Sequence, residues 1–182
     1  MKWVKQSIHY WCPDTKEHKF LGQNVTVAIL DTGISPHPDF KDRILSFRDF
    51  SSTTGSSEKV LFSFSHFSPL IDNSGHGTHV AGILAGSGLL SSGTYAGIAP
   101  FCNLIIGKVL DQNGNGSIKN VINGIQWIRD IYTQFHIRII NISVGTRPDL
   151  SIHQKLLLLN AVESLWDLGL VVVVSAGNYG PA

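Results

Sequence analysis

The sequence has few charges, few cysteines and no long apolar run. Charged residues make up 15% of its 182 residues, and 14 basic residues nearly balance 13 acidic ones, for a formal net charge of +1. No basic tract is longer than two residues, so we expect no nucleic-acid partner. No apolar run approaches the roughly 18 residues of a membrane-spanning helix, so we expect no membrane partner either.

The two cysteines, Cys12 and Cys102, lie far apart in the chain. A pair at this spacing indicates no disulfide framework, and we expect two reduced thiols. The segment that begins at Met1 contains lysines but no apolar stretch of about 7–15 residues, which a secretory signal requires. These observations favour a cytoplasmic protein, and an extracellular product of a longer precursor stays open as the alternative.

Hydrophobic residues make up 43% of the chain, which is enough for one domain with a sizeable core. Apolar runs typical of buried strands alternate with segments of helical periodicity. The expected strands are 25–30, 44–50, 104–110, 137–143 and 170–175, and the expected helices are 76–86, 117–132 and 153–168. Apolar strands that alternate with helices predict an α/β fold in which helices cover both faces of a parallel sheet.

The first expected helix contains three glycines, each of which costs about 1 kcal/mol relative to alanine. Packing must therefore hold this helix in place. Gly77, Ala81 and Ala85 recur every four residues and give it a smooth face for close burial against the sheet. We expect Asn73 or Ser74 to cap its N-terminus.

Three of the expected strands end in short segments of polar and small residues: Asp31-Thr32-Gly33, Ser143-Val144-Gly145 and Ala176-Gly177-Asn178. The carboxyl ends of parallel strands lie along one edge of a sheet, and functional groups collect at that edge in open α/β sheets. We therefore expect these three segments to lie together.

Five short segments follow one another in a recognisable order. They are Asp31-Thr32-Gly33 with His37-Pro38-Asp39 after it, His76-Gly77-Thr78-His79-Val80-Ala81-Gly82, Gly97-Ile98-Ala99-Pro100, Asn141-Ile142-Ser143-Val144-Gly145 and Ser175-Ala176-Gly177-Asn178. Together they resemble the motifs of the subtilisin-like serine proteases, the subtilase family, over roughly residues 21–181. The resemblance implies a three-layer, doubly wound parallel sheet. Residues 1–20 would be an N-terminal segment, and 21–182 a peptidase domain that is incomplete at its C-terminus.

The resemblance assigns Asp31 and His76 to the catalytic triad of a serine endopeptidase and Asn178 to its oxyanion hole. A serine hydroxyl needs a base to take its proton, and an imidazole that titrates near neutral pH suits that role. A carboxylate holds the imidazole in one tautomer, and an amide donor stabilises the negative oxygen of the intermediate. The implied substrate is a peptide or protein, and we expect no cofactor and no metal.

The resemblance also implies which residues border the substrate cleft: Gly114, Gly116, Ser143, Val144, Gly145, Ala176 and Gly177. The two glycines of the 111–116 loop would let an extended peptide pair with the edge of the cleft. The small residues on the opposite side would leave an open pocket with no acidic group. We therefore expect a large apolar side chain before the scissile bond.

The family's nucleophile lies downstream of the oxyanion asparagine in a Gly-Thr-Ser segment, and no such segment occurs in these 182 residues. We therefore predict that this polypeptide by itself has no protease activity. The missing C-terminal part of the same domain is the expected partner. Without that part, the sheet edge near 170–175 should be exposed, which would leave the chain marginally stable or prone to aggregate.

Other interpretations account for fewer residues. His76 and His79 could share a metal ion because residues three apart lie on one helix face, but no third ligand lies nearby at ligand spacing. The run 111–116 begins like a calcium loop, yet it places Ile122 where a glutamate is required. A nucleotide-binding domain would need a glycine-rich loop after the first strand. A non-catalytic protein that binds peptides in a protease-like cleft is the alternative function.

Overall fold

The computed structural model describes residues 2–10, 20–51, 72–145 and 150–178. The strands are β1 (Thr26–Asp31), β2 (Ile44–Asp49), β3 (Asn103–Lys108), β4 (Ile137–Ile142) and β5 (Val171–Val174). The helices are α1 (Lys2–Ser7), α2 (His76–Ala85), α3 (Ile118–Ile131) and α4 (Ile152–Asp167), with short 3₁₀ turns η1 (Lys41–Arg43) and η2 (Leu89–Ser91). Among these described residues no helix is both long and apolar enough to cross a membrane.

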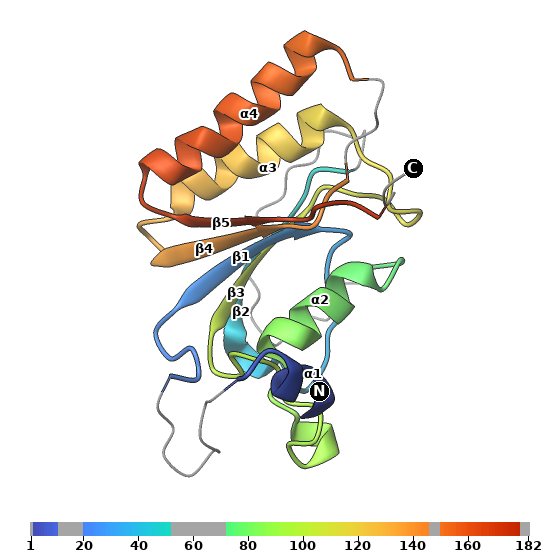
Figure 1. Cartoon of the computed structure of the whole chain (residues 1–182), viewed down its shortest axis with the longest axis vertical. Coiled ribbons are helices and arrows are strands. Elements are labelled where there is room, and N and C mark those ends of the chain that lie inside the picture. The colour runs from blue at the N-terminus through green and yellow to red at the C-terminus, as the bar shows by residue number, and fades with distance from the viewer. Residues whose placement is uncertain (1, 11–19, 52–71, 146–149, 179–182) are drawn as a thin grey trace.

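The five strands form one parallel sheet in the order β2-β3-β1-β4-β5. Helices α3 and α4 cover one face of this sheet, and α2 lies against the other face (Figure 1). The predicted parallel α/β architecture is therefore confirmed. Strand β3 ends at Lys108, two residues before the end of the expected 104–110 run. The amides of Val109 and Leu110 both donate to the carbonyl oxygen of Asp31, at 2.9 and 3.2 Å.

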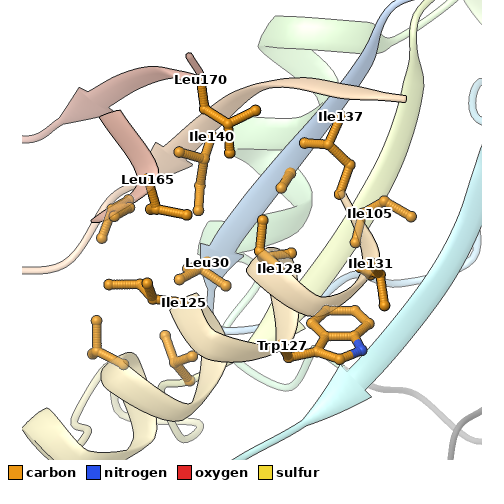
Figure 2. Packing of buried hydrophobic residues seen from close by; sticks show 14 of the residues in the cluster. Leu30, Ile105, Ile125, Trp127, Ile128, Ile131, Ile137, Ile140, Leu165 and Leu170 are labelled. Carbon is orange, nitrogen blue, oxygen red and sulfur yellow. The ribbon is translucent and has the colours of Figure 1, made fainter. Parts of the chain in front are cut away.

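Strand β1 supplies side chains to two separate cores, one on each face of the sheet. Ala28 and Leu30 pack into the cluster beneath α3 and α4, which Figure 2 shows from close by. Val27 and Ile29 pack into the cluster beneath α2. Successive side chains of a strand point to opposite faces, so the last residue of β1, Asp31, is directed towards α2.

Helix α2 lies close against the sheet through its smallest residues. Gly77, Ala81 and Ala85 are its buried residues, as the four-residue spacing predicted. The predicted N-cap at Asn73 or Ser74 is wrong. Gly75 occupies the cap position in a left-handed conformation, with φ 84°, and contributes no side-chain hydrogen bond.

Strand β5 forms an open edge of the sheet. Val171, Val173 and Val174 remain 54%, 47% and 59% exposed, although their sequence is typical of a buried strand. Leu170, just before the strand, is by contrast only 4% exposed because it packs into the cluster beneath α3 and α4. The expected exposure of this edge is confirmed for the three valines, and the side of β5 that faces away from β4 has no strand partner among the described residues.

Cys102 is a free thiol with no exposed surface. Burial raises the pKa of its thiol to about 11, so it stays protonated and unreactive at neutral pH. Cys12 lies outside the described residues.

Candidate active site

Asp31 is the last residue of β1, and its side chain is fully buried. It points to the face that α2 covers, because Val27 and Ile29 share its position in the two-residue repeat of the strand. The backbone amide of Thr32 donates to its Oδ1 at 2.7 Å. Burial of a carboxylate is costly unless hydrogen bonds compensate it. Oδ2 of Asp31 is buried with no hydrogen-bond partner among the described residues, so the fold holds this carboxylate in a fixed orientation at a cost in stability.

His76 is the first residue of α2, and its Nδ1 lies 2.7 Å from Oδ1 of Asp31. A carboxylate only accepts hydrogen bonds, so the proton of this contact is assigned to Nδ1 and the lone pair of the imidazole to Nε2. The side chain of His76 is 55% exposed, whereas that of Asp31 is buried. The pair therefore combines an inaccessible carboxylate with an accessible base, the order of groups that a nucleophile-activating site requires.

The approach of α2 to the turn after β1 depends on a glycine. A Cβ atom at Gly77 would lie 2.2 Å from the carbonyl oxygen of Gly33, closer than any side chain can pack. With no side chain in between, the first turn of α2 reaches the end of β1, and His76 comes within hydrogen-bond range of Asp31. The two residues are 45 positions apart in the chain, and this packing joins them.

Asp72 lies beside the pair and was not among the residues predicted from the sequence. Asp72 is 6% exposed, and its carboxylate accepts hydrogen bonds from the hydroxyl of Thr32 and from the amide of Thr78, both at 2.8 Å. Burial raises the pKa of Asp72, but hydrogen bonds, chiefly from Thr78, outweigh that effect and lower it below the ordinary carboxyl value. An aspartate four residues before a helical histidine was the available signal, since acidic groups stabilise helix N-termini.

Lys108, at the end of β3, is a second buried group that the sequence did not indicate. It is 9% exposed, and its Nζ donates to the carbonyl oxygens of Thr32 and Leu110. These carbonyls follow the ends of β1 and β3 respectively. The lysine therefore connects the turn that follows Asp31 with the residue just before the 111–116 loop. That loop was predicted to border the cleft.

The three predicted strand-end segments adjoin, as the sequence indicated. Ile142 of β4 is in register with Leu30 of β1 and with Val174 of β5. The amide of Ser175 donates to the carbonyl of Ile142, and its hydroxyl to that of Val144, both at 3.3 Å. Asn178 is exposed four residues beyond β5.

The predicted cleft residues fall into two groups. Some are exposed or have free space around them, and the others pack against or form hydrogen bonds with the rest of the chain. A Cβ at Gly114 or Gly145 would meet no described atom within 4 Å, and Ala176 and Gly177 are exposed. Val144 packs against the cluster beneath α3 and α4, and the hydroxyl of Ser143 accepts a hydrogen bond from the Asn141 amide at 2.7 Å.

Close packing within the chain explains why position 116 is a glycine. A Cβ there would lie 2.5 Å from the carbonyl oxygen of Val109 and 2.7 Å from a methyl group of Leu110. The 111–116 loop can therefore pack against Val109 and Leu110, the two residues after β3, only with glycine at position 116. The carboxylate of Asp111 holds the same loop by accepting from the amides of Asn113 and Asn115, at 2.8 and 2.9 Å.

A cavity of about 620 Å³ lies along α2, beside the segment 35–40. His37, Phe40, His79 and Ile83 are among its lining residues, but none of the predicted site residues is. No group of three or more potential metal ligands gathers within the ranges that the structure describes.

Comparisons with known proteins identify the family of this chain. The model of the subtilase family matches residues 22–182, and the chain belongs to that family. It is 42% identical over 165 residues to the serine protease AprX of Bacillus subtilis (strain 168), covering 88% of this chain and 34% of that protein. It is 37% identical over 169 residues to subtilisin E of the same strain, covering 92% of this chain and 38% of subtilisin E.

Solved structures show the same fold. Sphericase superimposes with a TM-score of 0.72 at 29% sequence identity, over 88% of this chain and 48% of the sphericase chain. The S41 psychrophilic protease gives a TM-score of 0.70 at 32% identity with the same coverage. The subtilisin-like fold is therefore confirmed, and the chain spans between about a third and a half of the length of these relatives.

Proposed function

We propose that this chain supplies the aspartate, the histidine and one oxyanion donor to the site of a serine endopeptidase that hydrolyses peptide or protein substrates. The contact between His76 Nδ1 and Asp31 Oδ1 at 2.7 Å carries the proposal. A histidine that served only the core would not leave half of its side chain exposed while its partner is buried. Membership of the subtilase family supports the same conclusion.

In this proposal each residue has one role. Nε2 of His76 takes the proton of the serine hydroxyl as its oxygen attacks the scissile carbonyl carbon, and later gives that proton to the leaving amine. Asp31 keeps the imidazole in the productive tautomer and stabilises the imidazolium that forms. The side-chain amide of Asn178 donates a hydrogen bond to the developing oxyanion.

The nucleophilic serine would come from outside these 182 residues, since they contain no Gly-Thr-Ser segment. We propose that the serine-bearing part of the domain packs on β5 and α4. The exposed valines of β5, together with Ile152, Leu156 and Trp166 of α4, which are 79%, 51% and 67% exposed, offer it an apolar surface. The 182-residue chain alone is accordingly expected to be inactive.

The experiment compares the 182-residue chain with the longer product obtained by continuing the coding sequence past Ala182. Both are incubated with an unstructured protein substrate and with a serine-directed fluorophosphonate. We expect hydrolysis and labelling by the longer product alone, with loss of hydrolysis in His76→Ala. His136→Asn is the control, because His136 is exposed just before β4, at the opposite end of that strand from the pair, and it should keep full activity.

Removal of the oxyanion donor gives a graded test. In subtilisin, a relative of this chain, loss of the oxyanion asparagine lowers kcat by about 10²–10³-fold, and Asn178→Ala in the longer product should lose a similar factor. Inhibitor-sensitive hydrolysis by the 182-residue chain itself would contradict the need for an external serine. A folded longer product that binds peptides but never cleaves them would instead favour the non-catalytic peptide-binding function.

A further inference from the structure

The buried carboxylate of Asp72 is saturated with hydrogen bonds. Its Oδ1 accepts from the hydroxyl of Thr32 at 2.8 Å, and from the amides of Ser74 and Gly75 at 3.2 and 2.9 Å. Its Oδ2 accepts from both the amide and the hydroxyl of Thr78. One side chain thereby holds the end of β1, the segment before α2 and the first turn of α2.

Thr32 extends this network to the two neighbours of the pair. Its hydroxyl donates to Asp72 and accepts from the amide of Gly77 at 2.9 Å. Thr32 directly follows Asp31, and Gly77 directly follows His76. The hydroxyl therefore fixes the separation between the two backbone segments that carry the acid and the base, at a point one residue away from each.

The N-terminus of α2 is otherwise held by the close packing of Gly77 against Gly33 and by the amide of Ser35, which donates to the hydroxyl of Thr78 at 2.9 Å. Its cap residue, Gly75, contributes no side-chain hydrogen bond, and its glycine content disfavours a helix. A negative charge at this end is favourable because it lies at the positive end of the helix dipole. A displacement of about 1 Å would lengthen the 2.7 Å contact between His76 and Asp31 beyond hydrogen-bond range.

We infer that Asp72 is a positioning residue for the Asp31–His76 pair and acts on it through Thr32 and the first turn of α2. It touches neither the reacting atoms nor the substrate in this role. The catalytic role of the pair rests on the proposed function. The contact between Asp31 and His76 does not, because both residues belong to this chain. A residue that merely capped α2 would change the stability of the chain and leave the pair intact.

The test is an NMR measurement on the 182-residue chain with ¹⁵N-labelled histidine, which needs neither the serine nor a substrate. The Nδ1 proton of His76 is assigned by its absence in His76→Asn, and its exchange with water is measured. In the unmodified chain we expect a resolved signal that exchanges at least about tenfold more slowly than that of the exposed His153. Equal rates would mean that the pair is not held, and would overturn the inference.

Three substitutions then probe the network. Asp72→Asn keeps the shape but replaces an acceptor oxygen with an amide, and Thr32→Val keeps the shape but removes the hydroxyl. In both variants we expect the His76 signal to broaden, or its exchange to accelerate about tenfold or more. Thr32→Ser restores the hydroxyl and should keep exchange within about twofold of the original rate.

The matched control is Asp39→Asn. Asp39 also accepts two backbone hydrogen bonds, from Gly88 and Leu90 at 3.0 and 3.2 Å, but it does not contact the pair. The Asp39→Asn substitution should leave the His76 signal unchanged, even if it lowers the unfolding midpoint of the chain. If Asp72→Asn does not fold, the two Thr32 variants decide the question.

An unchanged His76 signal in folded Asp72→Asn or Thr32→Val would overturn the inference and leave Asp72 as a cap alone. Failure of the longer product to cleave protein would overturn the proposed function but would leave the NMR result standing. The two failures are therefore distinguishable.

Discussion

Alanine substitutions at two glycines of α2 should change stability in opposite directions. A Cβ at position 77 would lie 2.2 Å from the Gly33 carbonyl oxygen, and the obstacle is backbone, which no rotamer change can move. A Cβ at position 82 meets no described atom within 4 Å. The same substitution on the same helix thus isolates the contact with the turn after β1.

The magnitude for Gly77→Ala follows from that clash. The helix must move by about 0.8 Å to bring the new contact to the 3.0 Å limit of real structures. Overpacking of this kind costs about 1–3 kcal/mol, and the upper end applies where backbone meets backbone. Alanine recovers about 1 kcal/mol of helix propensity, which leaves a net loss of about 2 kcal/mol.

For a chain of this size that loss lowers Tm by about 4–8 °C. Gly82→Ala should instead raise the stability by up to about 1 kcal/mol. The assay is thermal and urea unfolding followed by circular dichroism, in buffer with sucrose, which favours the compact state. The Nδ1 proton signal of His76 serves as a second reading, because the same movement lengthens its 2.7 Å contact with Asp31.

Equal gains in stability from both substitutions would refute the reasoning, because they would mean that α2 does not approach the turn as closely as described. A loss in both would point to a general intolerance of α2 to side chains rather than to this contact.

Three further predictions follow from other contacts. Asp72 has a lowered pKa, so its stabilisation is complete above the ordinary carboxyl pKa and is lost as the pH falls through the lowered value. The difference in unfolding free energy between the chain and Asp72→Asn should therefore be constant from about pH 5 to 7 and shrink below about pH 4; a difference that grew on acidification would contradict this. Gly116→Ala should cost about 1–3 kcal/mol in urea unfolding because of its clash with Val109 and Leu110, whereas Gly145→Ala should be within about 0.5 kcal/mol of the parent. Val173→Lys on β5 should slow aggregation in static light scattering with little change in unfolding, because Val173 is 47% exposed on an open edge; unchanged aggregation would show that another surface is responsible.

Much of the fold could be predicted because its signals are local. The apolar run before Asp31 and the alternation of strands with helices determined a parallel α/β sheet, since both reflect periodicity within a few residues. The four-residue spacing of Gly77, Ala81 and Ala85 identified the buried face of α2 for the same reason. Asp31 and His76 were found because short motifs surround each of them.

The supporting groups were missed because their partners are distant in sequence. Lys108 and Thr32 are 76 residues apart, and Thr32 and Asp72 are 40 apart. Nothing in the composition around a buried lysine or aspartate tells which backbone groups it will meet. The exposure of the β5 valines was expected from the family resemblance and not from local periodicity, because a strand that is apolar throughout looks the same at the edge of a sheet as at its centre.

By itself, then, the sequence determined the order of the five strands and of helices α2, α3 and α4, and its motifs pointed to Asp31 and His76. The tertiary structure alone decided that the pair meets at 2.7 Å and that one partner is buried while the other is half exposed. It also decided that Asp72 and Lys108 form hydrogen bonds with Thr32, the residue that follows Asp31. The physical reason is that hydrogen bonds and burial depend on distances in space. Packing across the sheet determines those distances, and they cannot be read from the spacing of residues along the chain.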